Sequence, residues 1–311
     1  MARSRSPRPF SGDVTCFKAG CQRRAYYFSL ANGRNGCGYH IAADDRGNLV
    51  KNPKAKDVRA TRFLEDQRQA ALAAATCASG SLCMKRLYMM KTPVDVRPGV
   101  LRVAPNHRAT SRTLHLPELS PKVMGPVLHT MPGLPPSLSL ENFHQGSKIF
   151  PHEVVSGVIT ERAREYRRRM FEDPKPRRHK FDDMKAVVGS GNLNVPLFSV
   201  FTSSKGDDRR YSYLEARMFY IRWYEHFCTL SEQFATLKRY LAEGYSIEIV
   251  GYDALEVHLS ADSMAKAYRD ASKPFGHEAV LCCLLLGLKP WSKDAEHAKY
   301  ADMFPDFLRR T

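Results

Sequence analysis

The sequence has no long apolar stretch, no dense set of cysteines and a shortage of acidic residues. No window approaches the ~18 consecutive apolar residues of a membrane helix, and the basic start MARSRSPRPF lacks the apolar run of a secretory signal peptide. We therefore expect no contact with membranes and an intracellular location. Eight cysteines in 311 residues are too sparse for a secreted disulfide scaffold and suit metal ligands or core positions.

The positive charge is concentrated in the first part of the chain. Residues 1–180 carry 32 basic and 14 acidic side chains, whereas residues 181–311 carry 16 and 18, and the net charge of the whole is +16. A basic segment of this kind is typical of proteins that bind DNA, RNA or another polyanion, because neutralised phosphates release counterions. The alternative is a soluble basic surface without a partner.

Three cysteines and a histidine near the start have the spacing of a metal site. They follow the pattern C-x4-C-x15-C-x2-H and are Cys16, Cys21, Cys37 and His40. Three thiolates and one imidazole fill a tetrahedral zinc shell, which predicts a structural site without an open position. The alternative is two chance pairs. The spacing is similar to short cysteine-rich units in some algal and large-virus proteins.

The pattern along the chain predicts an α+β protein in three parts. Residues 1–50 form a basic tail and the zinc-binding unit, and residues 51–140 form a helix followed by an extended proline-rich connector. Within the connector, residues 92–140 are expected to run over a surface with little regular structure. Residues 141–311 form a mainly helical globular domain with a few strands and a basic leading helix.

The leading helix VITERAREYRRRM and the following FEDPKPRRHK hold the strongest basic patch. We expect these side chains to contact nucleic-acid phosphates: Arg164, Arg167, Arg168, Arg169, Arg177, Arg178 and Lys180. The alternative is a solvated helix with internal pairs such as Glu165 to Arg169.

The second half of the chain contains a long apolar helix with one polar stripe. YSYLEARMFYIRWYEHFCTLSEQFATLKRYLAEGY predicts two helices divided near Thr229 to Ser231, and YSIEIVGYD predicts a half-buried strand. Glu215 and Arg222 share the polar stripe of the first helix. A cysteine pair in AVLCCLLLG, Cys282 and Cys283, is expected in the core.

A later helix begins in KPFGHEAVL with His277 and Glu278 in its first turn. The helix start could hold an anion, or Glu278 could cap its own helix. We expect Glu215, Arg222, His277 and Glu278 to line one pocket if the domain is an enzyme.

Two resemblances add to these expectations. The runs LENFHQGSKIFPHE, YSYLEARMFYIRWYE, GYSIEIVGYD and KPFGHEAVL resemble an uncharacterised protein family of large double-stranded DNA viruses, which implies action in the host cytoplasm or nucleus, or in the virion. FSVF followed by YSYLEARMFY is similar to the NADAR pattern, although Val200 replaces its asparagine. That similarity implies an N-glycosidase with Glu215 as its catalytic carboxylate.

Three functions remain open at this point. The first is a zinc-binding, basic protein associated with DNA or RNA, and it implies salt-sensitive binding. The second is a NADAR-like N-glycosidase acting on ADP-ribose or nucleotide derivatives, and it implies turnover that depends on Glu215. The third is a structural virion or assembly component that binds other viral proteins, and it implies a fixed stoichiometry in particles.

Overall fold

The computed structural model divides the chain into two compact units, Met1–Gln69 and Ala70–Thr311. The residues that it describes are 27–29, 35–36, 49–51, 80–87, 100–106, 113–179, 196–293, 300, 303–305 and 308. The predicted zinc ligands, Lys180 and the expected helix around residues 58–75 lie outside them.

The described part of the first unit is a small antiparallel sheet. β1 (Tyr27–Ser29) lies in its centre and pairs with β2 (Asn35–Gly36) and with β3 (Leu49–Lys51).

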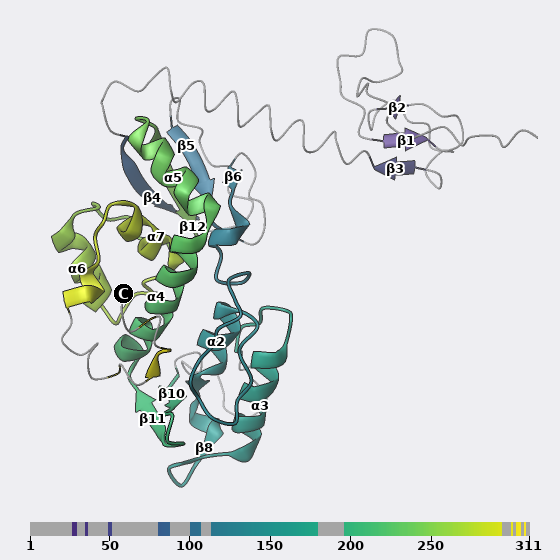
Figure 1. Ribbon diagram of the computed structural model, residues 1–311, viewed down its shortest axis with the longest axis vertical. Coiled ribbons are helices and arrows are strands. Elements are labelled where there is room, and N and C mark those ends of the chain that lie inside the picture. Colours follow the sequence, from purple (N-terminus) through teal and green to yellow (C-terminus); the bar gives the residue numbers. More distant parts are fainter. Residues whose placement is uncertain are drawn as a thin grey trace, which may run out of the picture. The chain divides into compact units, whose positions relative to one another are not determined.

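The second unit is built on a four-stranded parallel sheet (Figure 1). Its order is β4 (Leu82–Arg86), β12 (Ser246–Gly251), β5 (Val100–Ala104) and β6 (Leu114–His115). The strand predicted from YSIEIVGYD is confirmed as β12, but the expectation that it is half-buried is wrong, because it lies inside the sheet and is buried on both faces along most of its length. Both of its edges are paired with strands from the first half of the second unit.

The two faces of this sheet differ in chemistry. Ile247 and Ile249 on β12 pack in the main core. Between them, Glu248 points to the other face and accepts a hydrogen bond from Arg102 Nε at 2.6 Å, with both side chains 1% exposed. A buried ion pair of this kind costs desolvation and fixes strand register more than it adds stability.

A second sheet is antiparallel and lies beside two helices. Its order is β11 (Asp208–Tyr211), β10 (Phe198–Thr202) and β7 (Lys148–Ile149). α2 (Leu140–Gly146) precedes β7, and α3 (Glu161–Glu172) is the predicted arginine helix. A hairpin of β8 (Val154–Val155) and β9 (Val158–Ile159) joins β7 to α3.

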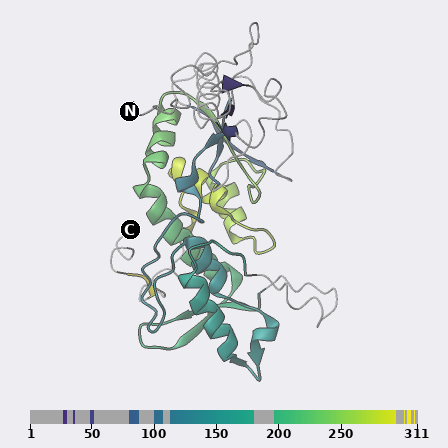
Figure 2. The same cartoon turned by 90° about the vertical axis from the view of Figure 1, so that its right-hand side faces the viewer.

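A long central helix, α4 (Tyr213–Leu230), connects the two sheets. Figure 1 shows α2, α3 and the antiparallel sheet at one end of α4, and the parallel sheet with α5 (Glu232–Ala242) and α7 (His277–Leu285) at the other; Figure 2 shows the same division from the side. α6 (Ala261–Arg269) lies between β12 and α7 in the chain. The break between α4 and α5 falls at Ser231, close to the predicted one, because the Ser231 side chain caps α5.

The mixture of helices and strands expected from the sequence is confirmed. Within the predicted connector, the described residues 100–106 and 113–140 differ from the expectation of a surface segment. Part of this segment forms β5 and β6, and its apolar side chains enter the core: Leu116, Leu119, Met124, Val127 and Met131 are all buried. Prolines exclude regular helix here, but they do not prevent irregular chain from burying the apolar residues between them. Among the described residues, no helix is both long and apolar enough to cross a membrane.

Candidate functional site

Glu215 lies at the start of α4 and is engaged by two neighbours. Its Oε2 accepts a hydrogen bond from the Ser212 backbone N–H at 2.7 Å, while the Ser212 hydroxyl accepts one from the Glu215 N–H at 3.3 Å. This reciprocal pair is a capping box. Oε1 accepts a hydrogen bond from the Tyr300 hydroxyl at 2.5 Å. These contacts hold the helix start and a distant residue, and they give no support to a catalytic role for Glu215.

Arg222 lies two turns further along the same side of α4. It donates a hydrogen bond to the Leu308 carbonyl, and its Nη1 lies 3.8 Å from Glu225 Oε2. Glu225 also accepts a hydrogen bond from Trp291 Nε1 at 2.9 Å and pairs with Lys289 Nζ at 2.5 Å. This side of α4 therefore anchors the C-terminal residues of the chain.

His277 and Glu278 begin α7 and contact the opposite side of α4. The ring of His277 lies 6.1 Å from that of Tyr224, and Tyr220 interacts electrostatically with Glu278. Because a helix turns about 100° per residue, the two tyrosines lie across α4 from Glu215. The structure therefore separates the four residues expected in one pocket into two pairs.

Glu278 is buried next to two glycines that give its carboxyl group room. The side chain is 1% exposed, and Oε2 has no hydrogen-bond partner among the described residues. His277 Nδ1 is 3.2 Å away but does not have hydrogen-bond geometry. A Cβ on Gly251 would stand 1.8 Å from Glu278 Oε1, and one on Gly276 would stand 2.9 Å from Oε2 and 2.7 Å from Asp253 Cβ. The side chains of Glu278 and Asp253 therefore both lie next to Gly276.

The surroundings of Glu278 favour its protonated form. Burial raises the pKa of Glu278, and the nearby Asp253 raises it further, whereas His277 opposes the shift. His277 is held by the residue that follows β5: its Nε2 donates a hydrogen bond to the carbonyl oxygen of Pro105 at 2.9 Å.

α2 and β7 place a lysine and a glutamate close to Asp253. Burial lowers the pKa of Lys148 to about 8, while Glu141 and Asp253 act to raise it and Arg178 to lower it. Lys148 Nζ donates a hydrogen bond to Gln145 Oε1 at 3.1 Å. An amine with this pKa can gain or lose a proton near neutral pH.

His144 on α2 is a further titratable side chain in this region. Its ring lies 5.0 Å from that of Tyr220, and burial holds the pKa of His144 well below its usual value, with Lys148 and Arg217 acting in the same direction. Burial also raises the pKa of the Tyr220 hydroxyl well above its usual value. At neutral pH both side chains are therefore uncharged hydrogen-bonding groups.

We call these side chains the acid–lysine cluster: Glu141, His144, Lys148, Tyr220, Asp253 and Glu278. They come from α2, β7, α4, α7 and the turn after β12. The turn lies at the carboxyl end of a parallel strand, which is where open α/β sheets bind ligands. Titratable groups with opposed environments in such a place are typical of an active site.

Sequence reasoning found only part of this cluster. It singled out Glu278 but not Asp253, although Asp253 closes the predicted strand YSIEIVGYD. It also passed over Glu141, His144 and Lys148 in LENFHQGSK, whose spacing of three and four residues was the available signal. Glu141 and His144 lie on α2, whereas Lys148 lies on β7, where it interacts electrostatically with Asp253.

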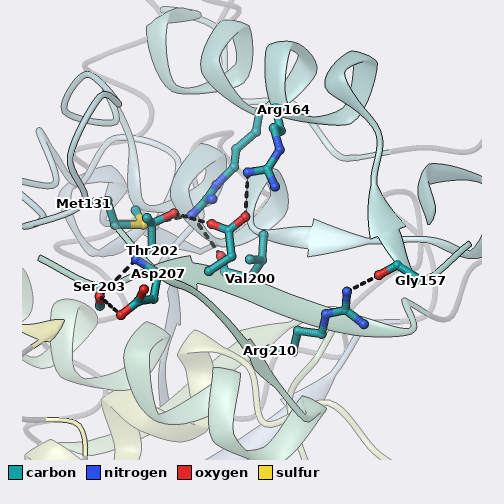
Figure 3. Close-up of polar contacts among 10 residues, drawn as sticks. Met131, Gly157, Arg164, Val200, Thr202, Ser203, Asp207 and Arg210 are labelled. Carbon is teal, nitrogen blue, oxygen red and sulfur yellow. Dashed lines mark hydrogen bonds and ion pairs between the residues drawn. The ribbon is translucent and has the colours of Figure 1, made fainter. Parts of the chain in front are cut away.

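The basic patch on α3 is partly structural. Arg167 is 5% exposed, and its Nη2 donates a hydrogen bond to the Val200 carbonyl at 2.9 Å and lies 2.8 Å from Met131 Sδ. Figure 3 labels these two partners, Val200 and Met131. Burial lowers the pKa of Arg167 to about 10. Arg164 on α3 pairs with Asp208 on β11 at 2.5 Å. These two arginines attach α3 to the antiparallel sheet.

The remaining arginines of the patch are on the surface. Arg168 donates a hydrogen bond to the Gly133 carbonyl at 2.6 Å, and Arg169 lies 3.6 Å from Glu165. Arg177 pairs with Asp173, and Arg178 is exposed. With Arg164, whose side chain is 45% exposed, five arginines of the predicted phosphate-binding set therefore keep exposed side chains.

Three cysteines of the described residues, Cys228, Cys282 and Cys283, are buried thiols. Cys282 and Cys283 are buried, which confirms the prediction that they belong to the core, and Cys83 is exposed on β4. Within the residues that can be described, no group of three or more His, Cys, Asp or Glu side chains could hold a metal ion.

Comparison of the chain with protein-family models, with curated proteins and with solved structures finds no match.

Proposed function

We propose that this chain is a hydrolase that cleaves the N-glycosidic bond of a ribosyl compound, with the acid–lysine cluster as its active site. The observation that carries the proposal is the buried carboxyl group of Glu278, whose Oε2 has no hydrogen bond among the described residues, lies 3.2 Å from His277 Nδ1 and is next to Asp253. Two carboxyl groups in contrasting environments are the basic equipment of glycoside hydrolysis.

The environments of the two carboxyl groups suggest their roles. Glu278 is fully buried and favours the neutral form, so it suits the general acid that protonates the departing nitrogen. Asp253 is partly exposed and interacts with Lys148, so it suits the group that stabilises a cationic sugar.

In the proposed reaction, water adds to the anomeric carbon as the carbon–nitrogen bond breaks. Glu278 gives its proton to the leaving nitrogen, and Asp253 accepts a proton from the water. Proton exchange with solvent then restores both groups. Lys148 interacts electrostatically with both Asp253 and Glu141.

The NADAR similarity of FSVF and YSYLEARMFY favours the same reaction class. It implied Glu215 as the catalytic carboxylate, but both oxygens of Glu215 accept hydrogen bonds from Ser212 and Tyr300. We therefore assign the chemistry to Glu278 and Asp253.

The test is hydrolysis by the full-length chain of ADP-ribosylated nucleic acid, ADP-ribosylated peptide and nucleotides, with chromatography of the released base or ADP-ribose. Glu278→Gln and Asp253→Asn should each lower the turnover rate about 100-fold or more. Glu243→Gln, on the exposed end of α5, is the matched control and should leave the rate unchanged. No turnover on any substrate, or wild-type rates in both variants, would refute the proposal.

A second candidate function is binding of DNA or RNA, assisted by a structural zinc ion. It is favoured by the net charge of +16 and by the exposed arginines Arg168, Arg169, Arg177 and Arg178. Zinc would be held by Cys16, Cys21, Cys37 and His40, a donor set that matches a closed tetrahedral site. The two functions are compatible if the substrate is a modified nucleic acid.

A further inference from the structure

A cavity of about 420 Å³ opens next to the acid–lysine cluster. It lies at the carboxyl ends of two neighbouring parallel strands, because Arg86 ends β4 and Ala254 follows the turn after β12. Along its other side runs α6. Its lining residues are Arg86, Ala254, Leu255, Glu256, Val257, Ser263, Lys266, Ala267, Asp270 and Lys273.

The backbone that forms one wall of this cavity is fixed by a buried arginine. Arg217 on α4 is 4% exposed, and it donates hydrogen bonds to four carbonyl oxygens, two of which belong to Asp270 (3.2 Å) and Lys273 (2.7 Å). The other two belong to Ala267 and Tyr268. A guanidinium with this many carbonyl partners holds the segment in one conformation, so the wall is formed before any ligand binds.

The charges in the cavity favour an anionic ligand. Arg86, Lys266 and Lys273 contribute three cations. Of the two carboxylates, Asp270 is engaged within its own turn, since its Oδ1 accepts hydrogen bonds from the Ser272 N–H at 2.9 Å and from the Ser272 hydroxyl at 2.5 Å. The Ser263 side chain adds a hydroxyl group that can donate to an anion.

The remaining lining residues suit the other parts of a nucleoside. Glu256 is an exposed carboxylate of the kind that accepts hydrogen bonds from ribose hydroxyls. Leu255, Val257 and Ala267 give an apolar surface for a base. The volume is within the usual range of small-molecule sites, roughly 300–1,000 Å³.

We infer that this cavity binds a phosphorylated nucleoside, with its phosphate on Arg86, Lys266 and Lys273 and its ribose hydroxyls at Glu256. Asp253 directly precedes the lining residue Ala254, and Gly251, which contacts Glu278, pairs with Arg86 across the sheet. The inference rests on the proposed function in one respect: the acid–lysine cluster acts on this ligand. It names the substrate class as nucleoside phosphates and their ribosyl derivatives.

The experiment measures binding of ADP, AMP, adenosine and inorganic pyrophosphate to the full-length chain by titration calorimetry. ADP should bind more tightly than adenosine, because ADP carries phosphates that reach the cations and adenosine carries none. The double variant Lys266→Gln, Lys273→Gln should weaken ADP binding about tenfold or more. Lys238→Gln, which changes an exposed lysine on α5, is the control and should bind like the wild type.

A second variant separates the nucleoside from the phosphate. Glu256→Gln should weaken binding of ADP while leaving that of pyrophosphate unchanged. Absence of ADP binding to the wild type, equal binding in the double variant, or pyrophosphate binding as tight as that of ADP would each overturn the inference.

The same measurements keep this inference distinct from the proposed reaction. Glu278→Gln should still bind ADP, because the proposed phosphate contacts come from Arg86, Lys266 and Lys273. Binding that follows the lysines in a protein without any hydrolytic activity would refute the reaction and support the nucleotide site. Hydrolysis that is insensitive to Lys266 and Lys273 would refute the nucleotide site and leave the reaction standing.

Discussion

At the residue scale, the protonation of Glu278 links stability to chemistry. Its pKa is raised above the ordinary value of 4.5, mainly by burial. A raised carboxyl pKa stabilises the folded state fully below about pH 4.5, and this contribution is lost as the pH rises through the higher folded-state pKa. The free energy of unfolding of the wild type should therefore fall over this pH range. Glu278→Gln cannot ionise at this position and should lack this part of the pH dependence.

We expect the free energy of unfolding of Glu278→Gln, relative to that of the wild type, to be higher at pH 8 than at pH 5. Urea denaturation at each pH measures it. The amide keeps the size of the side chain but cannot ionise. Glu278→Ala is the control for packing, and it should be destabilised at both pH values because it leaves a cavity. A difference between Glu278→Gln and the wild type that does not change between these two pH values would contradict this prediction.

At the element scale, α3 depends on one buried arginine for its attachment to β10. Arg167→Ala removes the partner of the Val200 carbonyl and leaves a cavity beside Met131. We expect a loss of about 2–4 kcal/mol in the free energy of unfolding. Urea denaturation of the full-length chain measures it.

Arg168→Ala is the matched control, because it changes the neighbouring residue on the exposed side of the same helix. Its loss should stay within about 1 kcal/mol, since its one hydrogen bond to the Gly133 carbonyl is exposed to solvent. Equal losses in the two variants would show that α3 is not held by Arg167.

The elements also show how far the sequence could be interpreted. The arginine helix, the break between α4 and α5 and the strand β12 follow from local periodicity and capping, and all three are confirmed. The pairing of β12 with β4 and β5 is not local, because Ile249 meets Met84 and Val103 across more than a hundred residues of chain. For the same reason, the helical spacing of Glu141 and Lys148 could not reveal that they approach Asp253.

At the scale of the whole molecule, the positive charge is expected to act as a polyanion-binding surface. Replacing both Arg168 and Arg169 with alanine should weaken DNA or RNA binding and reduce its salt dependence, by up to about one unit of logarithmic slope per lost phosphate contact. Fluorescence anisotropy with labelled oligonucleotides over a series of salt concentrations measures both quantities.

Arg239→Ala removes an exposed arginine from α5 and is the control for net charge. The double variant of Arg168 and Arg169 should reduce the salt slope more than Arg239→Ala does. An unchanged slope in the double variant would mean that the exposed side of α3 is solvated and does not contact phosphate.

The division into two units leads to a prediction about metal. Cys16, Cys21, Cys37 and His40 all belong to the first unit, Met1–Gln69, and are expected to bind one zinc ion with Zn–S distances of about 2.3 Å. Around them, Tyr26, Tyr27 and Phe28 are the one sizeable apolar cluster in the sequence of this segment. So few apolar residues cannot offset the entropy of ordering it, and metal binding would have to supply most of its folding free energy.

Chelation of the full-length chain should therefore increase hydrogen exchange across residues 16–40 and leave β4, β5, β12 and α4 protected. Cys37→Ser should give the same pattern without a chelator, and Cys83→Ser, which changes an exposed thiol on β4, is the matched control. Metal analysis should find one zinc per wild-type chain and per Cys83→Ser chain, and less than one in Cys37→Ser. A wild type without zinc, or a Cys37→Ser variant that keeps a full equivalent, would contradict the site, and loss of protection in β12 on chelation would show that the second unit depends on the metal.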